Sequence, residues 1–240
     1  MLAAEDRSPR LRRVTLGGPE LDGFAIELPA SSARLLLPEP GAGLLVPEWN
    51  GNEFLLPDGR RPAIRTLTPW DLGAGRMAVD VVLHGSGRAS SWAREAAPGD
   101  LVAVSGPGRG YAVDRDAPEF VVAGDETALP AIAQVLAAIP AGTPVQVHVE
   151  VVDDTARLEL PGDPVVDWHL LPGGAGPGDA MVDAVLGATF GPETRVWAAG
   201  EAAAVQRVRK HLFEARGLSR AQCTVRGYWK HGRAGGGDDD

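Results

Sequence analysis

In the first half of the chain, apolar and polar positions alternate most clearly at residues 77–84. Four apolar side chains share one face of this segment, and they are Met77, Val79, Val81 and Leu83. Asp80 and His84 fall on the other face, so the pattern predicts a β-strand with one buried face. Shorter apolar runs, separated by Gly and Pro turns, lie at residues 33–37, 64–67 and 101–104. Several short strands with frequent turns predict a small antiparallel barrel.

In the second half, apolar runs of strand length alternate with segments of helical period. The predicted strands are residues 120–123, 145–152, 165–171, 195–199 and 223–228, and the predicted helices are residues 128–139, 179–186 and 201–216. Apolar side chains recur at helical spacing in the first helix, at Ile132, Val135, Leu136 and Ile139. Gly217 follows the last helix as an expected C′ residue. Strands that alternate with helices predict a parallel sheet.

A polar stretch at residues 113–118 interrupts both patterns. We therefore expect an antiparallel β-barrel domain at residues 1–115 and an α/β domain with a parallel sheet at residues 116–234. Residues 235–240 are all Gly or Asp, and we expect them to be a disordered tail.

Charge and composition exclude several classes of protein. A formal net charge of −9 without a basic stripe argues against a nucleic-acid binder. No apolar run reaches the roughly 18 residues that a transmembrane helix needs. The first residues include Glu5 and Asp6 and lack the apolar core of a secretory signal. The single cysteine, Cys223, cannot form an internal disulfide, so a cytoplasmic location is the simplest expectation.

The most informative stretch joins the strand at residues 120–123 to the helix that follows. Gly124, Asp125, Glu126 and Thr127 form the junction. Thr127 can cap the helix, whose free N–H groups point back over the carboxyl end of the strand. In open α/β sheets nucleotides bind in that crevice. An ordinary strand-to-helix turn has the same spacing, so this pattern alone leaves both interpretations open.

Four segments, in order, resemble the siderophore-interacting protein family. They are Arg65-Thr-Leu-Thr68, Val82-Leu-His-Gly85 with Ala89-Ser-Ser-Trp-Ala93, Gly124-Asp-Glu-Thr-Ala-Leu-Pro-Ala-Ile132 and Gly227-Tyr-Trp229. Trp197-Ala-Ala-Gly-Glu-Ala202 also fits. The resemblance covers nearly the whole chain and is specific in combination, although each segment alone is weak. The family consists of flavin reductases distantly similar to ferredoxin–NADP reductases, which implies an FAD-binding barrel followed by an NAD(P)H-binding α/β domain.

The resemblance implies an FAD site on the barrel, where the family carries an Arg-x-Tyr-Thr signature. Arg65 would hold the pyrophosphate, and Thr68, the expected catalytic residue, would donate toward the flavin ring near its reactive nitrogen. Leu67 stands where the family has tyrosine, and Trp70 where a second arginine often follows. Loss of the aromatic contact costs about 0.5–1.5 kcal/mol, which would weaken flavin binding or shift its reduction potential. Without the other segments, Arg65 would be interpreted as a surface arginine.

A second phosphate-binding element is implied at Gly85 and the short helix after it. Ala89, Ser90 and Ser91 would line the pyrophosphate, because a glycine-rich turn at a helix start presents backbone N–H groups. Trp92 would anchor this helix to the barrel. Simple N-capping by Ser90 is the alternative. The backbone of Leu83 and His84 would meet the pyrimidine edge of the flavin, while the His84 side chain is expected to be structural.

The nicotinamide nucleotide would bind where two parallel strands end and two helices begin. No Gly-x-Gly-x-x-Gly stands in that context, and the resembled family does not use one. Arg157 and Arg207 are candidates to bind a phosphate on the adenine ribose, and the choice between NADH and NADPH stays open. The complete set of expected cofactor-binding residues is Arg65, Thr66, Leu67, Thr68, Leu83, His84, Gly85, Ala89, Ser90, Ser91, Asp125, Thr127, Ala128, Gly200, Glu201 and Trp229.

Positive charge near the flavin would attract an anionic ferric siderophore. Lys230 and Arg233 are the expected substrate-binding residues, and a solvated carboxyl-terminal tail is the alternative. The histidines lack metal-ligand spacing, so we expect no metal bound by the protein itself.

These observations favour an FAD-dependent oxidoreductase that reduces ferric siderophores with NAD(P)H and releases Fe(II). The alternatives are a general NAD(P)H:flavin reductase or diaphorase, and a non-catalytic flavin- or siderophore-binding protein. We expect no nucleic-acid partner and no membrane insertion. The siderophore and the oligomeric state stay open, with a monomer as the simplest case.

Overall fold

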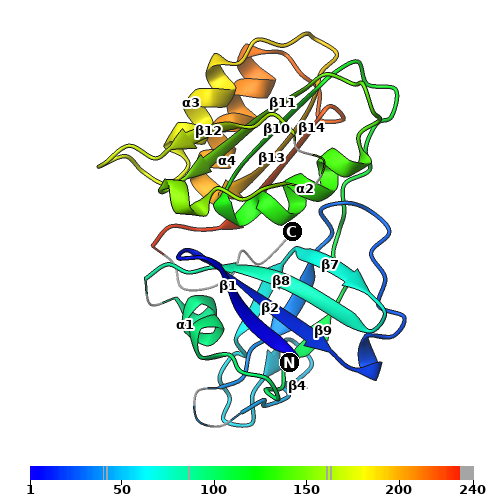
Figure 1. Cartoon of the computed structure of the whole chain (residues 1–240), viewed down its shortest axis with the longest axis vertical. Helices are drawn as coiled ribbons and strands as arrows, with labels where there is room; N and C mark the ends of the chain where they lie inside the picture. The colour runs from blue at the N-terminus through cyan, green and yellow to red at the C-terminus, as the bar shows by residue number, and fades with distance from the viewer. Residues whose placement is uncertain (40, 42, 86, 161, 163, 233–240) are drawn as a thin grey trace. The chain divides into compact units, whose positions relative to one another are not determined.

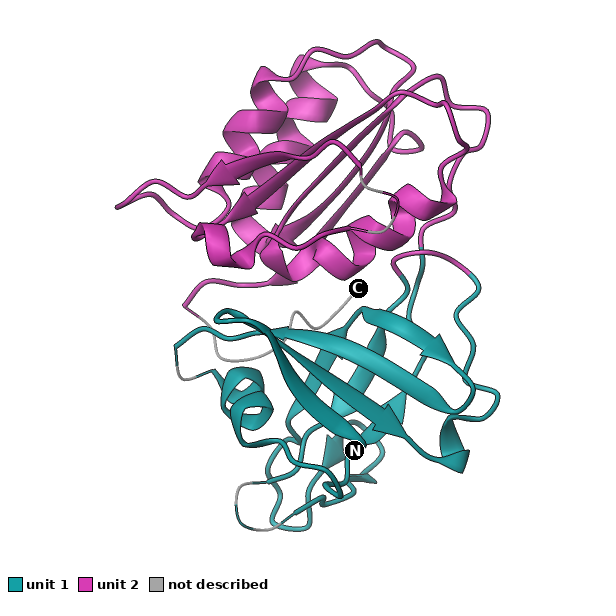
Figure 2. Ribbon diagram, in the orientation of Figure 1, with its two compact units in different colours: residues 1–27, 31–110, 234–238 teal, residues 28–30, 111–233, 239–240 magenta. Residues whose placement is uncertain are grey.

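The computed structural model describes residues 1–39, 41, 43–85, 87–160, 162 and 164–232. These residues form two compact units (Figure 2), each described by itself. Unit 1 contains Met1–Glu27 and Ser31–Gly110, and unit 2 contains Leu28–Ala30 and Tyr111–Arg233. The expected tail at residues 235–240 and the expected substrate-binding residue Arg233 lie outside the described residues.

Unit 1 is built from antiparallel sheets (Figure 1). The four-stranded sheet has the order β1 (Ala3–Ser8), β2 (Leu11–Gly17), β8 (Arg76–Val82) and β7 (Pro69–Gly73). The three-stranded sheet has the order β6 (Ile64–Leu67), β3 (Ala33–Leu36) and β9 (Ala103–Ser105). Strands β4 (Glu48–Trp49) and β5 (Phe54–Leu55) form a separate pair, and the helices are η1 (Pro19–Leu21) and α1 (Arg88–Glu95).

Both larger sheets of unit 1 pack around one hydrophobic core. Strand β8 contributes Met77, Val79 and Val81 from the predicted face, and Leu35 of β3 faces them in the same core. Trp92 anchors α1 in this core, as predicted. The fold class expected for the first half, an antiparallel β structure closed around its own core, is therefore confirmed.

The polar face of β8 carries an ion pair that the sequence pattern does not reveal. Asp80 is buried and accepts two hydrogen bonds from the Arg13 guanidinium of β2, at 2.7 and 2.8 Å. The same guanidinium lies 4.9 Å from the centre of the Trp70 ring. Trp70 therefore belongs to a stack of side chains on the four-stranded sheet.

Unit 2 contains the predicted parallel sheet. Its strands are β10 (Phe120–Asp125), β11 (Val145–Val151), β12 (Asp167–Leu170), β13 (Arg195–Glu201) and β14 (Cys223–Trp229). Its helices are η2 (Glu126–Ala128), α2 (Leu129–Ala138), η3 (Asp154–Ala156), α3 (Asp179–Gly187), α4 (Ala202–Lys210) and the π-helical turn η4 (His211–Ala215). Helices α3 and α4 pack on one face of the sheet and α2 lies on the other (Figure 1).

The strand order of unit 2 is β12-β11-β10-β13-β14, and every neighbouring pair is parallel. The chain therefore moves outward from β10 through β11 to β12, and then returns to the other side of β10 with β13 and β14. A reversal of this kind opens a crevice at the carboxyl ends of β10 and β13. The register pairs Gly124 with Ala199, which brings the ends of these two strands side by side.

Gly124 marks the closest packing at this junction. A Cβ atom there would lie 2.7 Å from the Cβ of Ala128 and 2.9 Å from the carbonyl oxygen of Ala199. Both neighbours are in the fold of unit 2 itself, one at the start of α2 and one on β13. Only glycine therefore lets the helix lie this close to the sheet.

We expect Gly124→Ala to lower the free energy of unfolding of unit 2 by about 1–3 kcal/mol, because the added methyl group overpacks the junction. Chemical denaturation followed by circular dichroism measures this. Gly187→Ala is the matched control, since no heavy atom lies within 4 Å of a Cβ at that position. Equal stability of the two variants would show that the junction relaxes freely.

Candidate functional site

The expected flavin-binding strand is β6 of unit 1 and the residue after it. Arg65 is half-buried, and one guanidinium nitrogen donates to the carbonyl of Ile64 at 2.6 Å. Thr66 is exposed, whereas Thr68 is buried. Leu67 is partly buried and packs against the core of unit 1. Leucine at this position therefore contributes to the barrel core as well as to the surface beside Arg65.

The second expected element joins β8 to α1. His84 and Gly85 are exposed, Gly85 has a φ of 42°, and Leu83 packs against the core. Ser90 is 0% exposed; its hydroxyl donates to the carbonyl of Val82 at 2.9 Å and accepts from the N–H of His84 at 3.0 Å. These bonds hold the end of β8 against the helix.

The geometry of Ser90 corrects the N-cap interpretation of its side chain. The N-cap of α1 is Gly87, so Ser90 lies inside the first turn and does not cap the helix. Its buried hydroxyl is also withdrawn from any bound phosphate. Ala89 and Ser91, which flank it, are half-buried and keep partial access to solvent.

The amino-terminal end of α1 retains its positive character. Among the described residues, no side chain accepts a hydrogen bond at the cap position, and the first turn contains no acidic residue. The first N–H groups of a helix have no partner within the helix, and the helix dipole places partial positive charge there. This end of unit 1 is therefore suited to an anion.

In unit 2, strand β10 ends with Asp125. Its carboxylate is buried, and the residue is 4% exposed. One oxygen accepts from the N–H and hydroxyl of Thr127, at 2.9 and 2.5 Å. The other accepts from the N–H of Glu201 at 3.0 Å and from the indole N–H of Trp229 at 2.8 Å. A single side chain thus joins the turn before α2 to the ends of β13 and β14.

This arrangement corrects the capping role expected for Thr127. Asp125 is the N-cap residue of η2, and Thr127 donates to it. Ala128, expected to contact the nucleotide, is 0% exposed and lies beneath the surface. Asp125 and Ala128 therefore shape the junction, and their side chains are not presented to a ligand.

Two further buried carboxylates repeat the pattern of Asp125. Glu201, at the end of β13, accepts from the N–H of Ala204 at 2.8 Å and caps α4. Glu150, on β11, accepts from the N–H groups of Gly178 and Met181 at 2.7 and 3.0 Å, at the start of α3. The starts of α3, α4 and the short turn η2 are therefore each matched by a carboxylate of the protein.

Burial controls the ionisation of these groups. It raises the pKa of Asp125 to about 6, although the hydrogen bonds from Thr127 and Trp229 act in the opposite direction. Burial also raises the pKa of Glu150, against the stabilising N–H groups of α3. Each carboxylate is thus held close to the start of a helix at a desolvation cost.

Gly200, expected to contact the nucleotide, is required by the same network. Its φ is 157°, and a Cβ atom there would lie 2.6 Å from the Oδ2 atom of Asp125. The glycine leaves the backbone of β13 in reach of the carboxylate.

The remaining expected residues lie at the end of β14, directly after η3 and within α4. Trp229 is half-buried and Lys230 is exposed. Arg157 pairs with Asp154 at 2.7 Å. Arg207 pairs with Asp179.

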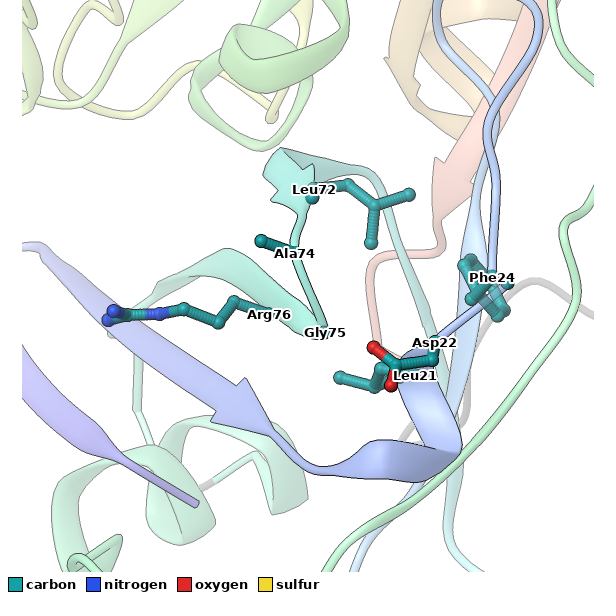
Figure 3. Close-up of a pocket in the computed structure, with 9 residues that line it drawn as sticks. Leu21, Asp22, Phe24, Leu72, Ala74, Gly75 and Arg76 are labelled. Atoms are coloured by element: carbon teal, nitrogen blue, oxygen red, sulfur yellow. The ribbon is translucent and has the colours of Figure 1, made fainter.

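Two cavities have volumes of about 270 Å³. One is in unit 1 beside the turn between β7 and β8, where the Asp22 carboxylate faces Gly75 and the Arg76 side chain points away from it (Figure 3). The other is in unit 2 and is lined by residues that include Arg157 and Trp168.

Sequence reasoning missed Glu150 and the pair His148 and His169. The available signal was the strand period, which places Glu150 and His148 on one face of β11. The register then pairs Glu150 with Asp125 of β10. The Nδ1 atom of His148 lies 3.2 Å from the Nε2 atom of His169. In the described part of the chain no group of three His, Cys, Asp or Glu residues could hold a metal ion, and no helix is long and apolar enough to cross a membrane.

The raised pKa of Asp125 predicts a pH-dependent stability. The carboxyl titrates near 3.8 in the unfolded chain and near 6 in the folded chain, so the folded state binds more protons between these values. Stability from this group therefore falls as the pH rises through that window. Asn cannot titrate and would also leave the donors of Glu201 and Trp229 facing an amide.

We expect Asp125→Asn to be less stable than the wild type, with a deficit that shrinks as the pH rises from 3.8 to about 6. Urea denaturation at several pH values measures the difference. Asp183→Asn, which removes an exposed carboxylate from α3, is the control. A deficit that stays constant over this range would refute the assignment of the titration to Asp125.

Two family models match nearly the whole chain. Residues 1–111 match the siderophore-interacting FAD-binding domain, and residues 117–232 match the siderophore-interacting protein. A solved siderophore utilization protein from T. fusca is similar over 98% of this chain and 92% of its own, with 32% identity and a TM-score of 0.82.

Two relatives that are named as reductases are also similar to this chain. Ferric vibriobactin reductase ViuB of Vibrio cholerae is 29% identical over 94% of this chain and 86% of its own. The NADPH-dependent ferric-chelate reductase of Escherichia coli is 34% identical over 55% of this chain and 52% of its own. At 15% identity, the cytochrome b5 reductase domain of Ulva prolifera nitrate reductase shares the fold over 95% of both chains with a TM-score of 0.64, which confirms the predicted reductase-like fold. The chain belongs to the siderophore-interacting protein family.

Proposed function

We propose that the protein is a cytoplasmic, FAD-dependent oxidoreductase that reduces ferric siderophores with NAD(P)H and so releases Fe(II) for iron assimilation. The observation that carries this proposal is the match of residues 1–111 to a siderophore-interacting FAD-binding domain, joined to a parallel sheet with an open reversal point. The name of the Vibrio cholerae relative, a ferric vibriobactin reductase, supports the same chemistry.

The residues of unit 1 fit the diphosphate of FAD. The start of α1 carries N–H groups that no described side chain caps, and Arg65 supplies a guanidinium on β6. We assign these two features to the diphosphate, with Ala89 and Ser91 beside it. Thr68, at the end of β6, would hold its hydroxyl toward the flavin ring, and the backbone of Leu83 and His84 would bind the ring edge.

When bound, FAD would accept a hydride from the nicotinamide and pass electrons singly to iron. One NAD(P)H supplies two electrons, so the overall reaction yields NAD(P)⁺, one proton and two Fe(II) from two Fe(III). The protein residues position the partners and exclude water. Lys230 would attract an anionic chelate, and its exposure suits that role. Arg233, which lies outside the described residues, is proposed for the same role.

We assign the nicotinamide nucleotide to unit 2, at the carboxyl ends of β10 and β13. Gly200 leaves that strand end open, and its neighbour Glu201 is turned inward to cap α4. The domain assignment is therefore FAD with the first part of the chain, expected at residues 1–115, and NAD(P)H with the second part, expected at residues 116–234.

A general flavin reductase is the second candidate, and one observation favours it. Leu67 stands where the family carries tyrosine and packs against the core, so it gives the flavin less aromatic contact. A flavin held less firmly can act as a substrate that leaves the protein. This candidate predicts fast reduction of free flavins and slow reduction of ferric siderophores.

The decisive assay is anaerobic oxidation of NADH and NADPH by the flavin-loaded protein with a panel of ferric chelates, while a strong Fe(II) chelator traps the product. We expect two Fe(II) for each nucleotide oxidised, because a hydride carries two electrons. No turnover with any chelate, together with fast reduction of free flavin, would replace the proposed function by the second candidate.

Arg65→Ala tests the flavin anchor. A charge-assisted contact contributes about 1.5–3 kcal/mol, so we expect FAD to bind at least about tenfold more weakly. Titration of the apoprotein with FAD, followed by flavin fluorescence, gives the dissociation constant without any turnover. Arg7→Ala, an exposed arginine of β1, is the matched control. Unchanged FAD affinity in Arg65→Ala would remove Arg65 from the site.

A further inference from the structure

The residues that would bind the adenine ribose of the nucleotide lie at and just after the end of β11. In a sheet of this order, the second strand of the fold ends beside the adenosine half of a dinucleotide bound across the reversal point. An acidic residue there binds the ribose hydroxyls of NADH, whereas an arginine accommodates the 2′-phosphate of NADPH. In this chain the second strand is β11, and residues 150–160 contain four carboxylates and one arginine.

Asp153 is the acidic residue best placed for the ribose. Glu150 is buried and bound to the start of α3, so it is withdrawn from the surface. Asp153 is exposed, and one of its oxygens accepts from the N–H and the hydroxyl of Thr155 at 2.8 and 2.5 Å. These two bonds fix the direction of the carboxylate just beyond the end of β11.

The single arginine of this segment is matched by its own carboxylate. Arg157 pairs with Asp154 at 2.7 Å, and both side chains are exposed to solvent. Arg207, the other arginine considered for a 2′-phosphate, pairs with Asp179 at the start of α3. A 2′-phosphate would therefore have to displace a carboxylate from either guanidinium, and near Arg157 it would also face Asp153.

A cavity of about 270 Å³ is lined by residues that include Arg157. Leu158, Leu160 and Trp168 also line it, and Glu159 adds a carboxylate. Apolar and aromatic side chains suit a purine ring, with polar groups at the rim to orient the attached sugar. Because Arg157 pairs with Asp154, the cavity adjoins the segment that carries the two carboxylates and suits the adenine of a nucleotide bound there.

From these observations we propose that the protein selects NADH over NADPH, with Asp153 binding the adenine ribose hydroxyls and Asp154 neutralising Arg157. The inference rests on the proposed function and sharpens it by naming the electron donor. It also sets this chain apart from its Escherichia coli relative, whose name specifies NADPH.

Binding of ADP-ribose and 2′-phospho-ADP-ribose to the full chain tests the proposal without hydride transfer or flavin. These compounds share the adenosine diphosphate and differ only by the 2′-phosphate. Isothermal titration should show ADP-ribose binding about tenfold more tightly, the scale expected for one or two like-charge contacts near a protein surface. The ratio of kcat/KM for NADH and NADPH should follow the same order.

Three variants separate the roles of the residues. Asp154→Asn releases Arg157 and should strengthen 2′-phospho-ADP-ribose binding while ADP-ribose is little affected. Adding Arg157→Gln to Asp154→Asn should abolish that gain. Asp153→Asn should weaken ADP-ribose and reduce the discrimination. Asp58→Asn is the control, because it breaks an equally exposed pair with Arg60, 2.7 Å long, in unit 1.

Equal or tighter binding of 2′-phospho-ADP-ribose by the wild type would overturn the proposal. So would absence of binding by both compounds in a protein that still oxidises a nicotinamide nucleotide, because the ribose would then be read elsewhere. If neither compound binds and neither NADH nor NADPH is oxidised, the proposed function itself fails. Loss of discrimination in Asp153→Asn, with circular dichroism unchanged, supports the assignment.

Discussion

The fold of unit 2 depends on the carboxylate of Asp125, which is buried where ionisation carries a large desolvation cost. Asp125 ends β10 and receives hydrogen bonds from the turn before α2, from the backbone of β13 and from the indole of β14. Without it, several donors would be buried without a partner, and each would cost about 1–3 kcal/mol. Burial penalises the ionised form, and this opposition is the reason for the raised pKa. Both glycines of the junction follow from the same constraint, since Gly124 admits the helix and Gly200 admits the carboxylate. The segment at residues 124–127, which resembles a nucleotide-binding loop, therefore has a structural role: its carboxylate joins the ends of β10, β13 and β14.

The two units differ in how their helix ends are matched. In unit 2, α3 and α4 begin on the buried carboxylates of Glu150 and Glu201, and Asp125 caps the short turn η2 that leads into α2. These carboxylates accept N–H groups and offset part of the favourable dipole. In the described part of unit 1, α1 begins without a side-chain cap. This difference suits the two dinucleotides of the proposed reaction. A prosthetic flavin gains from a helix end that remains available to its diphosphate, whereas a nicotinamide nucleotide must leave after every hydride transfer. A sheet edge whose helix ends are already neutralised binds a diphosphate less strongly and allows that exchange.

The sequence predicted those elements in which the pattern of apolar and polar side chains directly reflects burial. Strand β8 carries large apolar residues at every second position and β10 begins with four apolar residues, so each could be placed from local pattern alone. Strands β1, β2 and β7 were missed because charged residues interrupt them: Arg12 and Arg13 of β2 pair with Asp6 and Asp80, which lie far away in sequence or on another strand. Tertiary contacts also decided the roles at the site. Ser90, Asp125 and Glu201 were expected to meet a cofactor, yet each satisfies a backbone donor inside the fold. Short polar residues at a strand end look alike in sequence whether they face a ligand or a helix.

The departures of this chain from its family follow the same reasoning. Trp70 stands where the family resemblance leads us to expect an arginine, and its ring has a partner in Arg13, which is itself held by Asp80. A cation next to Arg13 would be repelled, so tryptophan at this position is consistent with the ion pair on the neighbouring strands. Leu67 packs against the barrel core, where a tyrosine would have to place its hydroxyl at the surface. Both side chains therefore make their contacts within unit 1 itself. In the proposed flavin site, Arg65 of β6 would then carry a larger share of the charge that a flavin diphosphate requires.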